Sequence, residues 1–131
     1  MQEPTFLILA ALAAQPRHGY GIVQAVAVLS ADEVKLKPGT LYGALDRLAE
    51  QGLIEVDHEE AVEGRLRRYY RLTADGAVAL AAEIARLDRR ASAAREELRH
   101  RPAFGRSILG GVAGRTILGG VAGRTILGGV A

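Results

Sequence analysis

The spacing of apolar and polar residues predicts three helices in the first half of the chain. Apolar residues at helical intervals indicate a first helix from about Pro4 to Ala14, and proline suits the first turn of a helix. A second helix opens at His18-Gly19 and stops near Ser30-Ala31-Asp32. The third begins at Pro38 and ends at Gly52, since glycine favours the position just past a helix end.

A β-hairpin and a long fourth helix are predicted to follow. Two stretches, 53–57 and 67–72, alternate in polarity and flank a polar loop that contains Gly64, which is typical of a hairpin. Thr73 suits the N-cap of a helix that runs to about Arg101, where Pro102 ends it. The pattern therefore predicts a mainly α-helical fold with a small β-hairpin.

The last residues of the chain form a tandem repeat. Three copies of a nine-residue block, GRSILGGVA in the first, occupy residues 105–113, 114–122 and 123–131. A nine-residue period keeps neither a helix face nor a strand face constant, and each copy carries a Gly-Gly pair that disfavours both. We therefore expect residues 102–131 to be a flexible tail that is dispensable for folding.

Composition and charge narrow the class of protein. The chain has 131 residues, of which 49% are apolar and 24% charged, and this fits one folded domain with an appendage. No cysteine is present, so disulfides, thiol chemistry and cysteine–zinc sites are excluded. Of the 17 lysines and arginines, three lie in the tail, whereas all 15 acidic residues precede it. A nucleic-acid surface on the main domain must therefore be a local patch.

The third predicted helix carries such a patch on the side opposite its apolar face. Thr40, Gly43 and Arg47 form an i, i+3, i+7 stripe. Glycine allows a close approach to base pairs, and arginine can form two hydrogen bonds with guanine, so the stripe suits a helix in a major groove. Lys35 and Lys37 precede the helix and suit contacts with phosphates. An ordinary solvent-exposed helix face is the alternative explanation.

The predicted hairpin adds positive charge. Arg65, Arg67, Arg68 and Arg71 lie within seven residues, interleaved with two tyrosines, and suit contact with phosphate oxygens. The connecting loop is expected to hold the four acids between residues 57 and 63, so pairing within the hairpin is the alternative explanation for these arginines. A helix-turn-helix followed by a basic hairpin is a winged helix, which we assign to the first 73 residues.

Four stretches in this order resemble the PadR-like family of bacterial transcriptional regulators over about residues 3–101. They are PTFLIL (4–9), PRHGYGI (16–22), PGTLYGAL (38–45) and GRLRRYYRLT (64–73). The resemblance implies a homodimeric repressor whose third helix reads an inverted-repeat operator in double-stranded DNA and whose hairpin grips the backbone. It also implies a small aromatic or amphipathic effector, for which we identify no pocket residues.

Two residues depart from the pattern of this family. Lys37 stands where many relatives have serine, so a cation replaces the usual helix cap. Leu66 stands where many relatives have proline, so we expect a less rigid hairpin.

The fourth predicted helix fits the dimer that the resemblance implies. Apolar residues recur at alternating intervals of three and four from residue 77 to residue 98, a heptad seam typical of a coiled coil. Packing on its own domain is the alternative, but about 28 residues make roughly 42 Å of helix, more than a small winged helix covers. We therefore assign residues 74–101 to a dimerisation helix with contacts from Leu80, Ile84, Leu87, Ala91 and Leu98.

No catalytic, cofactor or metal site is predicted. The three histidines are scattered, no nucleophile is paired with a base, and no phosphate-binding glycine loop occurs. The longest apolar run, Phe6 to Ala14, is too short to cross a membrane and lacks the positively charged start of a signal peptide. We therefore expect a cytoplasmic, nucleoid-associated regulator of transcription. A winged helix that binds protein and not DNA is the alternative function.

Overall fold

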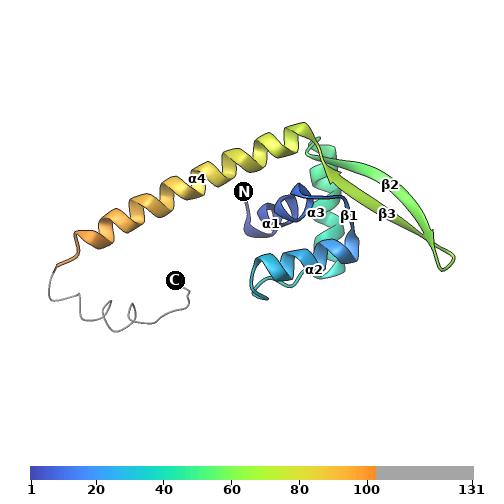
Figure 1. Cartoon of the computed structure of the whole chain (residues 1–131), viewed down its shortest axis with the longest axis horizontal. Helices are drawn as coiled ribbons and strands as arrows, with labels where there is room; N and C mark the ends of the chain where they lie inside the picture. The colour runs from blue at the N-terminus through green and yellow to red at the C-terminus, as the bar shows by residue number, and fades with distance from the viewer. Residues whose placement is uncertain (103–131) are drawn as a thin grey trace. The chain divides into compact units, whose positions relative to one another are not determined.

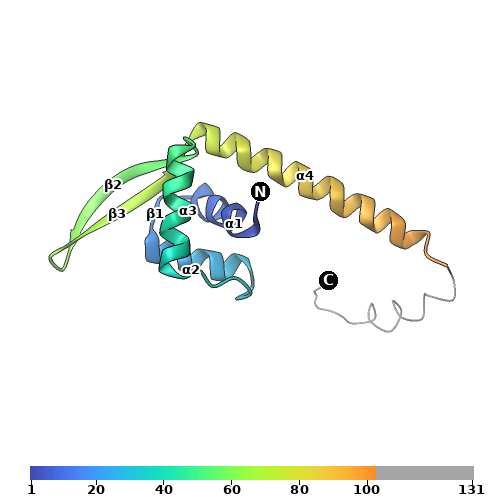
Figure 2. The ribbon, with the colours of Figure 1, turned by 180° about the vertical axis from the view of Figure 1, so that it is seen from behind.

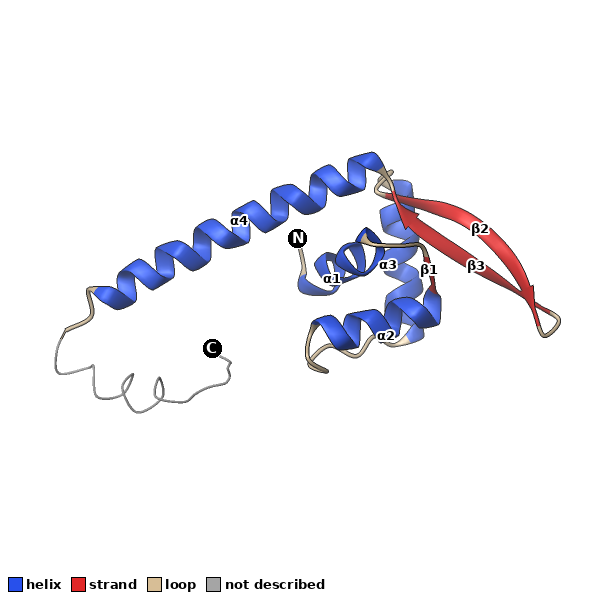
Figure 3. Ribbon diagram, viewed as in Figure 1, coloured by secondary structure: helices blue, strands red, loops and turns tan. Residues whose placement is uncertain are grey.

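A computed structural model describes residues 1–102 of the chain, and within them four helices and a three-stranded sheet (Figures 1 and 3). The nine-residue repeats, for which the sequence predicts a flexible tail, lie outside the described residues. Met1–Asp88 form one compact unit that includes the first half of the last helix. In chain order the elements are α1 (Glu3–Ala13), β1 (Arg17–His18), α2 (Gly19–Leu29), α3 (Pro38–Glu50), β2 (Ile54–Val62), β3 (Arg65–Leu72) and α4 (Ala74–Arg99).

The core lies between the first three helices, and α3 ends at the base of the hairpin, which projects away from the helix at an angle (Figures 1 and 2). The buried side of α3 repeats at intervals of three and four residues, as an amphipathic helix requires. Ile54 at the start of β2 and Leu80 of α4 complete the core. The largest fully buried side chains are Ile8, Leu9, Ile22, Val26, Leu41, Leu45 and Ile54.

The helix boundaries follow the signals in the sequence. His18 caps α2, because its Nδ1 accepts a hydrogen bond from the Gly21 amide at 3.3 Å. Gly52 follows α3 with a φ of 76°, the left-handed conformation that favours glycine just past a helix end. Thr73 caps α4, because its Oγ1 accepts a hydrogen bond from the Gly76 amide at 3.0 Å. The predicted N-cap at Thr73 and the predicted glycine just past the end of α3 are confirmed, whereas the His18 cap is visible only in the structure.

The sheet has the antiparallel order β1-β3-β2. The prediction of a two-stranded hairpin missed β1, whose Arg17 and His18 pair with Tyr70 and Tyr69 of β3. Two residues are too few to show an alternating pattern, so the sequence carries no signal for this strand. Through β1, the start of α2 is fixed beside the hairpin.

The hairpin is longer than the sequence predicts. In place of strands at 53–57 and 67–72 with a polar loop, β2 and β3 continue until only Glu63 and Gly64 join them. Both turn residues have positive φ, 52° and 77°, as a two-residue type I′ turn requires. Three of the four acids expected in the loop therefore lie on β2, opposite β3.

The first turns of α4 pack against the domain on a stripe formed by Gly76, Leu80 and Glu83. Leu80 is only 7% exposed, so its assignment to the dimer seam is wrong: this side chain fills the core of its own domain. Buried Glu83 accepts a hydrogen bond from Arg86 Nε at 2.9 Å, and this bond lowers the pKa of Glu83. The other predicted seam residues, Ile84, Leu87, Ala91 and Leu98, are exposed.

Candidate nucleic-acid interface

The residues predicted to read DNA lie on the exposed side of α3. Thr40 and Arg47 are exposed, and Gly43 is half-buried between them. The Arg47 guanidinium folds back along the helix, with Nη1 3.8 Å from the position that a Cβ on Gly43 would occupy. This is an ordinary van der Waals separation, so the arginine lies directly over the Gly43 position of the stripe.

Two predicted phosphate contacts precede α3. Lys35 and Lys37 are both exposed, whereas Leu36 between them is 8% exposed and belongs to the core. An extended segment alternates its side chains, so anchoring Leu36 inward directs both lysines outward. Lys37 is the N-cap residue of α3, but its side chain makes no capping hydrogen bond. Both ammonium groups thus lie near the start of the helix that carries the predicted stripe.

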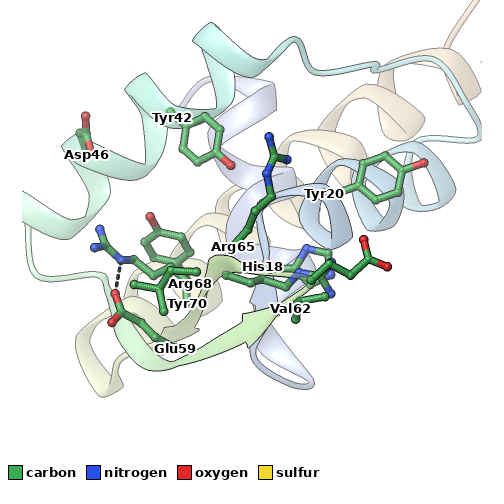
Figure 4. A pocket seen from close by; sticks show the side chains of 13 residues that line it. His18, Tyr20, Tyr42, Asp46, Glu59, Val62, Arg65, Arg68 and Tyr70 are labelled. Atoms are coloured by element: carbon green, nitrogen blue, oxygen red, sulfur yellow. Dashed lines mark hydrogen bonds and ion pairs between the residues drawn. The ribbon is translucent and has the colours of Figure 1, made fainter.

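A cleft of about 920 Å³ lies between α3 and the hairpin, and we call it the α3–hairpin cleft (Figure 4). Its walls come from the start of α2, from α3 and from both strands of the hairpin. Arg65 extends between Tyr42 and Tyr20, while Asp46 lies toward the other end of the cleft, on the side of Arg68. Arg65 and the tyrosine hydroxyls thus lie toward one end of the cleft and Asp46, Glu59 and Arg68 toward the other, and Glu63 of the hairpin turn also lines it.

The four hairpin arginines divide into two pairs. Arg68 donates a hydrogen bond from Nε to a Glu59 carboxylate oxygen at 2.9 Å, and Arg71 pairs with Glu55 at 2.6 Å. Within residues 1–102, neither Arg65 nor Arg67 forms an ion pair. Pairing inside the hairpin therefore accounts for Arg68 and Arg71, whereas the other two arginines are available for an external anion.

Two histidines contact the same tyrosine of β3. The His58 ring stacks on Tyr69 with centroids 4.4 Å apart, and the His18 ring meets Tyr69 edge-on at 5.2 Å. The hydrogen bond to Asp57 at 2.6 Å raises the pKa of His58, and Glu60 raises it further. Burial, followed by the charge of Arg67, lowers the pKa of His18. The pKa values of the two histidines are therefore shifted in opposite directions, down for His18 and up for His58.

Sequence reasoning missed two tyrosines of the cleft. Tyr20 is 67% exposed and Tyr42 50% exposed, which is high for large aromatic side chains. A Cβ on Gly19 would come within 2.5 Å of the Tyr42 hydroxyl, so glycine at this position lets α3 approach the start of α2. Helical spacing alone places neither tyrosine beside the hairpin, because their proximity depends on the packing of three separate elements.

Two features are absent from the described part of the chain, a cluster of metal-binding side chains and a membrane-length apolar helix. Residues 1–102 contain no group of three histidine or acidic side chains placed to hold a metal ion. None of the four described helices is long and apolar enough to cross a membrane. The clustered functional groups are those of the α3 stripe and the α3–hairpin cleft.

Comparison with known proteins decides the family. The sequence pattern described as the transcriptional regulator PadR-like family matches residues 8–82. The chain belongs to the PadR-like family. A relative from Mycobacterium tuberculosis (strain ATCC 25618 / H37Rv), transcriptional regulator Rv3488, is 40% identical over 94 residues, which are 72% of this chain and 71% of that protein. The match to a Lysinibacillus sphaericus protein, 31% identical over 70 residues, covers 53% of this chain and 64% of that protein's length. The family is one of transcriptional regulators and not of enzymes.

Solved structures of PadR proteins share the fold. A PadR family transcription regulator from Clostridium difficile R20291 superposes with a TM-score of 0.63 at 27% identity, over 74% of this chain and 99% of that chain. Bacillus subtilis PadR, solved in complex with operator DNA, superposes with a TM-score of 0.57 at 21% identity, over 64% of this chain and 48% of that chain. The winged-helix fold predicted from the sequence is thereby confirmed.

Proposed function

We propose that this PadR-like chain represses transcription by binding double-stranded DNA, with α3 in the major groove and the hairpin on the adjacent backbone. The observation that carries the proposal is that Thr40 and Arg47 are exposed on either side of half-buried Gly43, on a helix that also forms one wall of the α3–hairpin cleft. On the opposite wall, Arg65 and Arg67 have no ion-pair partner among the described residues. The Bacillus subtilis relative of the same fold was solved with operator DNA.

The chemistry of the two surfaces suits different parts of a DNA duplex. A guanidinium on an exposed helix face can bond the O6 and N7 atoms of guanine, which distinguishes one base pair from another. Arginines on the hairpin and lysines before the helix suit phosphate oxygens, which fix orientation without reading sequence. Arg47 is therefore proposed to specify sequence, while Arg65, Arg67, Lys35 and Lys37 position the protein on the backbone.

We further propose that two chains act together on an inverted-repeat operator. Ile84 is 44% exposed, Leu87 40% and Leu98 51%, and with Ala91 they continue an apolar seam along α4 that suits a second copy. A two-fold dimer places its two reading helices in successive major grooves. Release by a small aromatic or amphipathic effector is an expectation from the family resemblance, as is action in the cytoplasm at the nucleoid.

A binding-site selection tests this function. The full chain is used to enrich duplexes from a random-sequence library, and affinities for an enriched duplex and its scrambled version are measured by fluorescence anisotropy. Arg47→Ala should weaken binding to the enriched duplex by about 1–3 kcal/mol and leave binding to the scrambled duplex nearly unchanged. Equal losses on both duplexes would show that Arg47 contacts only phosphate. Failure to enrich any sequence would favour a protein-binding winged helix.

A further inference from the structure

One ion pair of the hairpin lies within the α3–hairpin cleft. Glu59 and Arg68 are directly opposite each other on β2 and β3, and the bond between them is 2.9 Å long. Both residues line the cleft together with Asp46 of α3 (Figure 4). Arg71 makes a similar cross-strand pair with Glu55, but neither of these residues lines the cleft. The hairpin thus carries two comparable Glu–Arg pairs, of which only one faces the proposed DNA surface.

The pair in the cleft changes what Arg68 can offer to DNA. Its Nε already donates to Glu59, and the carboxylates of Glu59 and Asp46 add negative charge at the same end of the cleft. A phosphate entering there meets two like charges beside one occupied guanidinium. The Arg68 side chain is 55% exposed and that of Glu59 38%, so the pair is held only weakly and depends on the charge of Glu59.

We propose that Glu59 limits the affinity of this interface for DNA by holding Arg68 on the cleft wall and by repelling the phosphate backbone. Arg68 then makes no phosphate contact in the unmodified protein, contrary to its assignment from the sequence. Phosphate contacts strengthen binding to every sequence alike, so suppressing one leaves site choice more dependent on the base contacts of α3. This inference rests on the DNA binding proposed above.

The experiment compares variants of the full chain: Glu59→Gln, Arg68→Gln, the double variant, and Glu55→Gln as a control with the same change in charge. Fluorescence anisotropy titrations use an enriched duplex and its scrambled version over a series of salt concentrations. Each new phosphate contact steepens the slope of log affinity against log salt by about 0.9, equivalent to about threefold between roughly 50 and 200 mM salt. Melting temperatures verify that every variant is folded, and Glu59→Ala provides a second neutral replacement.

The expected result is specific to the pair in the cleft. Glu59→Gln should tighten binding to both duplexes by about threefold or more at low salt and steepen the slope by about one unit per subunit. The double variant should lose this extra slope, and Glu55→Gln should not produce it. Arg68→Gln alone should leave the slope unchanged.

Two results would overturn the inference while leaving DNA binding intact. One is an equal effect of Glu59→Gln and Glu55→Gln, which would show that only net charge matters. The other is a flatter slope for Arg68→Gln alone, which would show that Arg68 already contacts a phosphate. If the unmodified chain binds neither duplex, the proposed function itself is wrong, and this outcome is distinguishable from the other two.

Discussion

Replacing Gly76 with alanine tests the packing that joins α4 to the winged helix. Gly76 is buried in the first turn of α4, and a Cβ added there would overlap the carbonyl oxygen of Leu53 and lie 2.8 Å from Leu72 Cδ1. The same carbonyl accepts a hydrogen bond from the Thr73 amide at 3.0 Å. The start of α4 therefore has to move away from Leu53, and this movement stretches the Thr73 bond.

The size of the effect follows from three contributions. Overpacking of a closely packed site costs about 1–3 kcal/mol, and loss of a backbone hydrogen bond costs about 1 kcal/mol more. Alanine regains about 1 kcal/mol because it favours helix more than glycine does. The expected net loss is about 2 kcal/mol, and for a domain of this size it lowers Tm by roughly 8–16 °C.

Circular dichroism melts at one fixed protein concentration measure this loss, since oligomerisation makes Tm depend on concentration. Gly39→Ala is the matched control, because Gly39 also lies in a helix but has no atom within 4 Å of the added Cβ. Its Tm should stay the same or rise slightly. A Gly76→Ala protein that melts within about two degrees of the unmodified chain would refute the argument, because α4 would then tolerate a side chain that the packing excludes.

Three further predictions concern the hairpin and α4. Arg65→Ala and Arg67→Ala should each reduce the salt slope of DNA binding by about one unit per subunit, and an unchanged slope in the double variant would exclude the phosphate role. Leu87→Glu should dissociate the proposed dimer in light-scattering measurements, whereas Val78→Glu, at a 69% exposed position outside the seam, should not. The raised pKa of His58 means that its stabilising contribution is complete below pH about 6.5 and is lost as pH rises through the folded value. The Tm difference between the unmodified chain and His58→Gln should therefore shrink as pH rises above about 6.5, and a constant difference would contradict this.

Sequence analysis was most accurate for the helix ends and helix faces, which local signals determine. Pro38, Gly52 and Thr73 mark helix ends through backbone constraints that act within a few residues, and the structure follows them. The buried side of α3 was predicted because its apolar residues repeat at helical spacing over three turns. These features need no knowledge of the rest of the fold.

The length of the hairpin was not predicted, because most of β2 is exposed and therefore lacks alternation between apolar and polar residues. The missed signal was the turn. Glu63-Gly64 resembles the short polar-glycine pairs of type I′ turns, and this turn fixes the register of the strands that it joins. From Val62 opposite Arg65, counting back places Glu59 opposite Arg68. Recognising the turn would thus have revealed the ion pair in the cleft.

The α4 seam illustrates a different limit. A heptad pattern shows which residues share a face of a helix, but it does not say which partner covers that face. Leu80 fits the seam and yet fills the domain core. The first turns of α4 pack against this core, so the apolar residue at that point is covered by its own domain. Ile84 and Leu87, one and two turns after Leu80, are exposed.

Charge balance makes the arrangement of the hairpin pairs important for selectivity. All 15 acidic residues lie before the repeats, where they nearly cancel the basic residues, so long-range attraction of this domain to DNA is weak. Two of the four hairpin arginines are also neutralised by acids on β2. Non-specific affinity for DNA depends on the number of phosphates that the protein neutralises, so these pairs would keep that affinity low in the proposed complex. In the proposed complex, base contacts from α3 would supply a larger share of the binding free energy. A mismatch in the operator would then cost a larger fraction of the total binding free energy.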